Sequence, residues 1–176
     1  MTLIDPAISW TLALSVAVLF GAAASHKLRD WKQFRDVVLN YKLLPDAVVP
    51  LAAIALIALE CAAAIFVLIV ATRSIGAILS AGILATYAVA MAVNLRRGRV
   101  NLDCGCLGIG RRQPVRWWMV GRNLAMAVLA LIAGLPMASR ELTALDGVTI
   151  IGATLSLAFL YTAQSLLGAA PRSVLE

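Results

Sequence analysis

Cys104 and Cys106, separated by a single glycine, are the two side chains in this sequence best suited to covalent chemistry. The flexible Gly105 between them lets the thiols approach the separation that a disulfide needs, in a small and strained ring. Strained, exposed disulfides tend to be labile or catalytic. The alternative is a glycine-rich turn that contains two incidental cysteines. We call residues 96–113 the dithiol loop. Arginines in or beside it favour the thiolate, which promotes both thiol–disulfide exchange and metal binding; they are Arg96, Arg97, Arg99, Arg111, Arg112 and Arg116.

Glu60 and Arg122 are ionisable residues inside long apolar runs. A charge within a membrane-spanning segment is energetically expensive and indicates a functional site by default. At about 1.5 Å per helical residue, Glu60 lies about 20 Å and Arg122 about 12 Å from the side of the dithiol loop. We therefore predict that the two side chains pair, or that they share a polar pocket with Asn94 and Asn123. A purely architectural ion pair is the alternative.

Three further residues have two interpretations each. Cys61 is either a small packing residue or a third thiol that relays exchange with the loop pair. His26, at the end of the first apolar run, is either solvated or takes part in ligand binding or proton transfer. Lys27 is expected to contact lipid headgroups, together with Arg29 and Lys42, unless it binds a cofactor. The candidate cofactor-binding residues are His26, Lys27, Asn94 and Asn123, and no metal ligands are assigned.

The composition indicates an integral membrane protein. Of the 176 residues, 62% are hydrophobic and 14% are charged, and the mean hydropathy is +0.92, well above that of a soluble domain. The net charge of +6 is carried between long apolar runs, so we expect anionic lipid headgroups, and not nucleic acid, as its partner. Three cysteines are too few for a disulfide scaffold.

The apolar runs predict an all-α membrane bundle of four to five transmembrane helices, forming one domain over residues 1–176. A hydrocarbon core about 30 Å thick requires about 20 apolar residues per helix. Asp5 and Pro6 suit a helix start, and the lack of Lys or Arg before Trp10 favours a retained span over a signal peptide. Residues 25–46 mix charges with regularly spaced apolar residues, which predicts an interfacial amphipathic helix. The predicted spans are residues 7–24, 47–70, 75–95, 114–135 and 147–167.

The distribution of basic residues predicts an orientation. Lys and Arg concentrate in the loops after the first and third spans, whereas the loops after the second and fourth spans contribute Arg73 and Arg140. By the positive-inside rule, the dithiol loop is expected to be cytoplasmic.

Several motifs resemble those of the methylamine-utilisation protein MauE family, within the wider group of DoxX-like, redox-associated membrane proteins. The similarity covers about residues 24–123, and its most specific part is the Cys-Gly-Cys block after Arg-Gly-Arg. Leu107 stands where the family usually has phenylalanine. The motifs are His26-Lys27-Leu28-Arg29-Asp30, Phe34, Tyr41-Lys42-Leu43-Leu44-Pro45, Glu60, Arg97-Gly98-Arg99 and Asp103-Cys104-Gly105-Cys106-Leu107-Gly108.

The resemblance implies a location in the bacterial plasma membrane and a role in maturing methylamine dehydrogenase, whose small subunit is rich in disulfides. It also implies a thioredoxin-like partner. Disulfide formation would place the dithiol on the periplasmic face, in conflict with the loop charges. We predict a membrane thiol–disulfide oxidoreductase that uses Cys104 and Cys106, with Glu60 and Arg122 lining a pocket for a quinone-like acceptor or handling protons. The alternatives are a thiolate carrier of a soft metal such as Cu(I) or Hg(II) and a non-catalytic subunit that anchors a redox partner.

Overall fold

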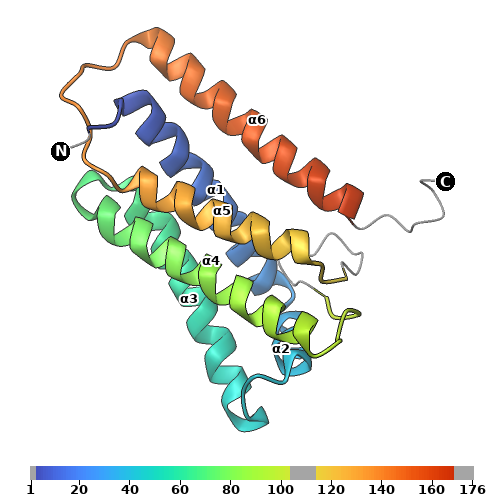
Figure 1. Cartoon of the computed structure of the whole chain (residues 1–176). Helices are drawn as coiled ribbons and strands as arrows, with labels where there is room; N and C mark the ends of the chain where they lie inside the picture. Colours follow the sequence, from blue (N-terminus) through green and yellow to red (C-terminus); the bar gives the residue numbers. More distant parts are fainter. Residues whose placement is uncertain (1–2, 104–113, 169–176) are drawn as a thin grey trace, which may run out of the picture.

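The computed structural model describes residues 3–103 and 114–168, and in this part the chain is all-α, as the sequence predicts (Figure 1). Asp5 caps the first helix by accepting a hydrogen bond of 2.8 Å from the Ala7 amide, and Pro6 occupies the first helical position, as expected. The helices are α1 (Pro6–Arg29), α2 (Trp31–Tyr41), α3 (Val49–Leu68), α4 (Arg73–Arg96), α5 (Trp117–Ala133) and α6 (Ala144–Gly168), with 3₁₀ turns at η1 (Asp46–Val48) and η2 (Val70–Thr72).

Four of these segments are long and apolar enough to cross a bilayer: Pro6–Arg29, Asp46–Leu68, Val70–Arg96 and Ala144–Leu166. The chain is therefore a multi-pass membrane protein. The remaining apolar helix, α5, has 17 residues, at the short end of what a span requires. It begins at Trp117 and not at Pro114, because Pro114 pairs with Asp103 in an isolated bridge just before the helix.

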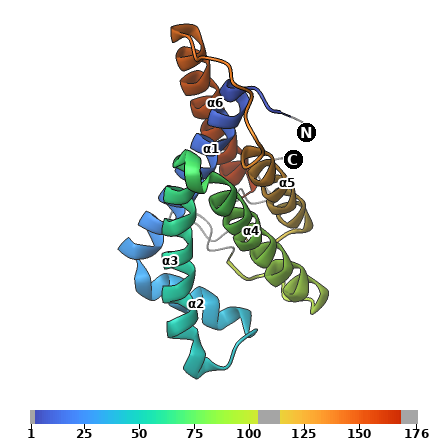
Figure 2. The ribbon, with the colours of Figure 1, turned by 90° about the vertical axis from the view of Figure 1, so that its left-hand side faces the viewer.

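The first helix is longer than the sequence predicts. It runs to Arg29, so His26 and Lys27 belong to its last turn and not to the amphipathic segment. The break falls at Asp30, whose backbone leaves the helical conformation and whose carboxylate accepts the Gln33 amide at 3.2 Å. The amphipathic helix is thus α2 alone. It lies at the end of the bundle where α4 ends (Figure 2).

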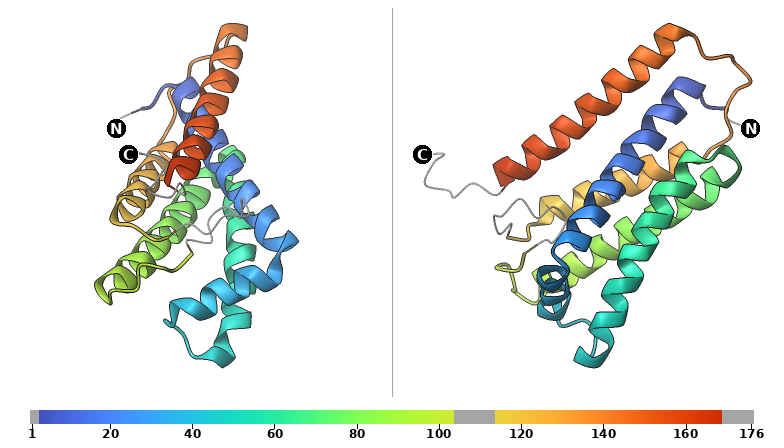
Figure 3. Two further views of the ribbon diagram at one scale, coloured as in Figure 1. Left: turned by 90° about the vertical axis from the view of Figure 1, so that its right-hand side faces the viewer. Right: turned by 180° about the vertical axis from the view of Figure 1, so that it is seen from behind.

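The bundle is organised around α1, which packs against α3, α5 and α6, while α4 packs against α3 and α5 (Figure 3). Small and branched residues fill the central core, so the helices approach closely; its buried members are Ala13, Val16, Phe20, Ala63, Val67, Ala81, Ile83, Leu84, Ala127 and Ala130. The outer faces of the helices remain apolar and exposed, as expected for surfaces that contact lipid.

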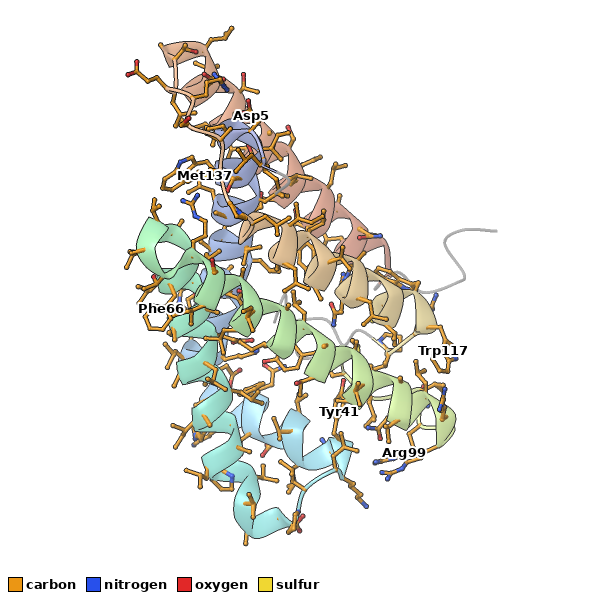
Figure 4. All side chains as sticks on the ribbon, turned by 60° about the vertical axis from the view of Figure 1, so that its left-hand side comes forward. Asp5, Tyr41, Phe66, Arg99, Trp117 and Met137 are labelled. Atoms are coloured by element: carbon orange, nitrogen blue, oxygen red, sulfur yellow. The ribbon has the colours of Figure 1, made fainter. Side chains whose placement is uncertain are left out.

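The two ends of the bundle differ in charge. At the end that carries Asp5 and Met137 (Figure 4), Arg140 forms ion pairs with Asp5 and Asp146, and its guanidinium and the Ala7 amide hold the pKa of Asp5 below its ordinary value. Arg73, counted as a loop charge in the sequence, is only 3% exposed. It donates to Val67 O at 3.2 Å and stacks 4.0 Å from the Trp10 ring. This end therefore presents little unpaired positive charge among the described residues.

Candidate functional site

A buried charged cluster joins α1, α3 and α4 in the interior of the bundle. The ammonium of Lys27 forms an ion pair with Glu60 Oε1. The Tyr87 hydroxyl donates to the same carboxylate oxygen at 2.7 Å, and Lys27 Nζ donates to Tyr87 Oη at 2.9 Å. We call Lys27, Glu60 and Tyr87 the buried triad.

The triad is almost completely withdrawn from solvent. Glu60 is 0% and Lys27 is 5% exposed. The Lys27 ammonium also lies 4.7 Å from the centre of the Phe34 ring and 4.8 Å from that of Tyr87, so aromatic faces replace part of its lost hydration. The second carboxylate oxygen, Glu60 Oε2, has no hydrogen-bond partner within the described part of the chain. A buried carboxylate with an unsatisfied oxygen is a candidate for accepting a proton or a ligand donor.

The predicted partners of Glu60 and Lys27 are both wrong. Glu60 pairs with Lys27 and not with Arg122, and Lys27 lies inside the bundle instead of contacting headgroups. Counting residues gives the depth of Glu60 along the helix, but the neighbour that its side chain faces depends on how α3 is rotated about its own axis. Lys27 is buried because α1 continues past Ala24 as a helix. Tyr87 was missed, and its only sequence signal is a polar hydroxyl in an apolar span, which normally requires a partner.

Arg122 lies in a second polar group between α5 and α6. Its Nη1 donates to Ser165 Oγ at 3.2 Å, and its guanidinium lies 5.0 Å from the Trp118 ring centre and 4.7 Å from that of Tyr161. Arg122 is 8% exposed, and its Nε and Nη2 find no acceptor among the described residues. The neighbouring Asn123, 2% exposed, has an unpartnered Nδ2 in the same part of the chain.

In the described part of the chain, the contacts that hold the buried triad and those that hold Arg122 involve different residues, in place of the single predicted pocket. Tyr161 belongs to the Arg122 group, since its ring lies 4.7 Å from the guanidinium. Asn94, expected in the same pocket, instead donates to Ala90 O at 3.1 Å and accepts from Arg99 at 3.2 Å. It belongs to the end of α4 and not to the triad.

Two arginines of the dithiol loop fasten α2 to the end of α4. Arg99 donates to Asn40 O at 2.9 Å and to Tyr41 O at 3.3 Å, and Arg97 reaches Lys42 O at 3.4 Å. Figure 4 shows Tyr41 and Arg99 at this end of the bundle, opposite Asp5. These carbonyls end a helix, where a cation is favourable. Both arginines therefore have a structural role beside the predicted effect on the thiols.

Replacing Arg99 with methionine is expected to loosen α2 and to destabilise the protein by about 1.5–3 kcal/mol, the range for hydrogen bonds to a charged group. Thermal unfolding in detergent and limited proteolysis after Lys42 would measure the two effects. Arg97→Met is the matched control, because Arg97 makes one long contact to the same segment. Equal effects of both substitutions would contradict the role assigned to Arg99.

The remaining predicted residues are placed as follows. His26 is half-buried in the last turn of α1. Cys61 is a free thiol that packs beside the buried cluster of Ala24, Phe34, Ala53 and Ile57, which suits a packing role. Cys104 and Cys106 lie outside the described residues. The described segments that flank them are hydrogen-bonded to each other, because the Val115 amide donates to Leu102 O at 3.1 Å. Within the described residues, no group of three or more His, Cys, Asp or Glu side chains is arranged to hold a metal ion.

Comparisons with known proteins identify relatives along nearly the whole chain. The family model of the methylamine utilisation protein MauE matches residues 5–136. The methylamine utilization protein MauE of Paracoccus denitrificans is 39% identical over 169 residues, which cover 94% of this chain and 90% of the relative. Those of Paracoccus versutus and Methylophilus methylotrophus are 38% and 34% identical, over 95% and 93% of this chain and 90% and 87% of their own lengths. No solved structure matches. The resemblance seen in the sequence is confirmed: the chain belongs to the MauE family.

Proposed function

We propose that this protein is a membrane thiol–disulfide redox protein of methylamine utilisation, in which Cys104 and Cys106 form the redox pair. The observation that carries the proposal is the Cys-Gly-Cys sequence in an arginine-rich loop of a multi-pass MauE-family protein. Its substrate would be a partner protein that acquires disulfides, with methylamine dehydrogenase as the partner implied by the family. A thioredoxin-like protein would act beside it.

The described ends of the dithiol loop support this proposal. Asp103 pairs with Pro114 just before α5, so both ends of the segment that contains the cysteines meet at one place. Tyr41 of α2 lies near this place: burial, together with the charge of Asp103, raises the pKa of its hydroxyl above the ordinary value. The loop is thus attached to the same end of the bundle as α2 and the last turn of α1.

The chemistry requires an electron acceptor. Oxidation of two cysteine thiols to one disulfide releases two electrons and two protons, and a quinone consumes the same number when it is reduced to a quinol. A lipid-soluble quinone reaches the protein from the bilayer and suits an apolar bundle. We assign Glu60 to proton handling, because its Oε2 is buried and has no partner among the described residues.

Thiol trapping in intact cells tests the redox pair. A bulky, membrane-impermeant maleimide is added to the wild type and to the Cys104→Ser, Cys106→Ser and Cys61→Ser variants, with and without prior reduction. In intact or in permeabilised cells, depending on the side on which the loop lies, we expect its thiols to react only after reduction, and Cys61→Ser to behave as the wild type. Full maturation of the partner protein in the Cys104→Ser/Cys106→Ser double variant would contradict the proposal.

The same experiment determines the orientation. The end of the bundle that carries the dithiol loop is the basic one, and burial of Arg73 strengthens the asymmetry, which favours a cytoplasmic loop. A role in disulfide formation favours the periplasm. Labelling in intact cells would place the pair outside, whereas labelling only after permeabilisation would place it in the cytoplasm and indicate a reductase.

A further inference from the structure

An apolar groove with a volume of about 170 Å³ opens between α1, α5 and α6. Its walls include Leu12 and Leu19 of α1, Met126 and Leu129 of α5, and Leu157 of α6. We call it the α1–α5–α6 groove. Leu129 and Leu157 are exposed on the apolar surface that the bilayer surrounds, so an occupant can enter from the lipid without crossing water. The shape and lining suit a hydrocarbon chain.

Three of the helices that line the groove, α1, α5 and α6, each carry a polar residue four positions from a wall residue and one turn nearer to the end with the dithiol loop; Leu84 of α4 also lines the groove. On α1, His26 follows Ala22 of the groove wall by four residues. On α5, Arg122 precedes Met126 by four residues, and on α6, Ser165 follows Tyr161 by four. Residues four apart on a helix share a face. None of the three lines the groove itself, but the helix register places His26, Arg122 and Ser165 one turn beyond its wall. We call these three residues the polar end.

Two of these polar residues are in direct contact, which confirms the register argument for α5 and α6. Arg122 Nη1 donates to Ser165 Oγ at 3.2 Å, and the Arg122 guanidinium lies 4.7 Å from the centre of the Tyr161 ring, which itself lines the groove. The apolar and polar parts are thus continuous at Tyr161. Figure 3 shows α6 running beside α1 toward this end.

Arg122 has fewer hydrogen-bond acceptors among the described residues than its guanidinium has donors. It is more than nine-tenths buried, yet Nε and Nη2 have no hydrogen-bond partner among the described residues, and no carboxylate there forms an ion pair with it. A buried guanidinium with unmet donors is unfavourable unless something else supplies acceptors. These donors lie next to one end of the apolar groove. An occupant with a hydrocarbon tail and a hydrogen-bond-accepting head would fill the groove with its tail and accept from Arg122 with its head.

We propose that the α1–α5–α6 groove binds an isoprenoid quinone, with its tail in the apolar part and a ring carbonyl accepting from Arg122. A neutral ring fits better than a phosphate, because the polar end offers one cation flanked by the aromatic rings of Trp118 and Tyr161. His26, one turn beyond Ala22 of the groove wall, would donate to the second carbonyl. The choice of a quinone rests on the proposed thiol oxidation: two thiols become a disulfide while the quinone takes two electrons and two protons to become a quinol.

Quinone binding can be measured without the thiol reaction. The full-length protein, in nanodiscs of phosphatidylcholine, is titrated with a short-chain ubiquinone, and quenching of tryptophan fluorescence reports binding near Trp118. Arg122→Gln is expected to weaken binding at least tenfold, and Ala158→Phe, which fills the groove wall without touching the polar end, to weaken it similarly. Arg35→Gln, an exposed arginine on α2, is the matched control and should bind as the wild type.

The outcomes separate this inference from the proposed function. Binding that persists in the Cys104→Ser/Cys106→Ser variant supports the site even if the thiol proposal fails. Unchanged quinone binding in both Arg122→Gln and Ala158→Phe would overturn the inference. It would also be overturned if anionic phosphatidylglycerol in the nanodiscs displaced the quinone and required Arg122, because the site would then hold a phospholipid. Should Arg122→Gln fail to fold, Ala158→Phe and His26→Gln still decide the question, with binding by both variants at wild-type strength counting against it.

Discussion

Replacing Lys27 with methionine is expected to destabilise the protein by about 3–5 kcal/mol, the range for removing one partner of a buried ion pair. The substitution leaves the Glu60 carboxylate at 0% exposure without its cation. The Tyr87 hydroxyl alone would then satisfy Oε1, since it donates to it at 2.7 Å. The expected effect is large because a low-dielectric interior screens charges poorly. The attraction that is lost is therefore strong, and so is the penalty for leaving the Glu60 carboxylate buried and charged.

Thermal unfolding in detergent would measure this change, with a second substitution to isolate the pair. Glu60→Gln alone should also destabilise, whereas Lys27→Met/Glu60→Gln should recover much of the loss, because no uncompensated charge remains. The exposed pair of Arg35 and Asp36 is the matched control; Arg35→Met should cost about 0–1 kcal/mol. Additive losses in the double variant would contradict direct coupling of Lys27 and Glu60.

Replacing Gly76 with alanine is expected to force α3 and α4 apart. A Cβ at this position would lie 2.3 Å from the backbone nitrogen of Val67 and 2.6 Å from the carbonyl carbon of Phe66. Because both neighbours are backbone atoms, no side-chain rotation can relieve the overlap. We expect the free energy of unfolding to fall by about 3 kcal/mol, the upper end of the range for overpacking.

Gly82, on the same helix, provides a matched control for Gly76. A Cβ there meets nothing within 4 Å, so Gly82→Ala should stabilise the protein slightly, by up to about 1 kcal/mol, through helix propensity. Thermal unfolding of both variants in the same detergent gives the comparison. If Gly76→Ala proved as stable as Gly82→Ala, the close approach of α3 and α4 would be wrong.

The sequence by itself determined the class of the protein and the approximate positions of its helices, although α1 runs past its predicted end and α5 begins later than predicted. Apolar runs of about 20 residues are sufficient for this, since a backbone in lipid must satisfy its own hydrogen bonds and does so as a helix. The Asp5–Pro6 start follows from capping chemistry, which is local. Membership of the MauE family could also be recognised from short motifs around Cys104 and Cys106, although these cysteines lie outside the described residues.

Only the tertiary structure decided which buried polar residues meet. Residue counting gives depth along a helix axis, and it placed Glu60 and Arg122 inside the bundle correctly. It carries no information on how one helix is rotated against the next, and this rotation turns Glu60 toward Lys27 and Tyr87, and Arg122 toward Ser165. Rotation is set by the packing of many apolar side chains at once. The partners of a buried charge therefore emerge only when all the helices are in place.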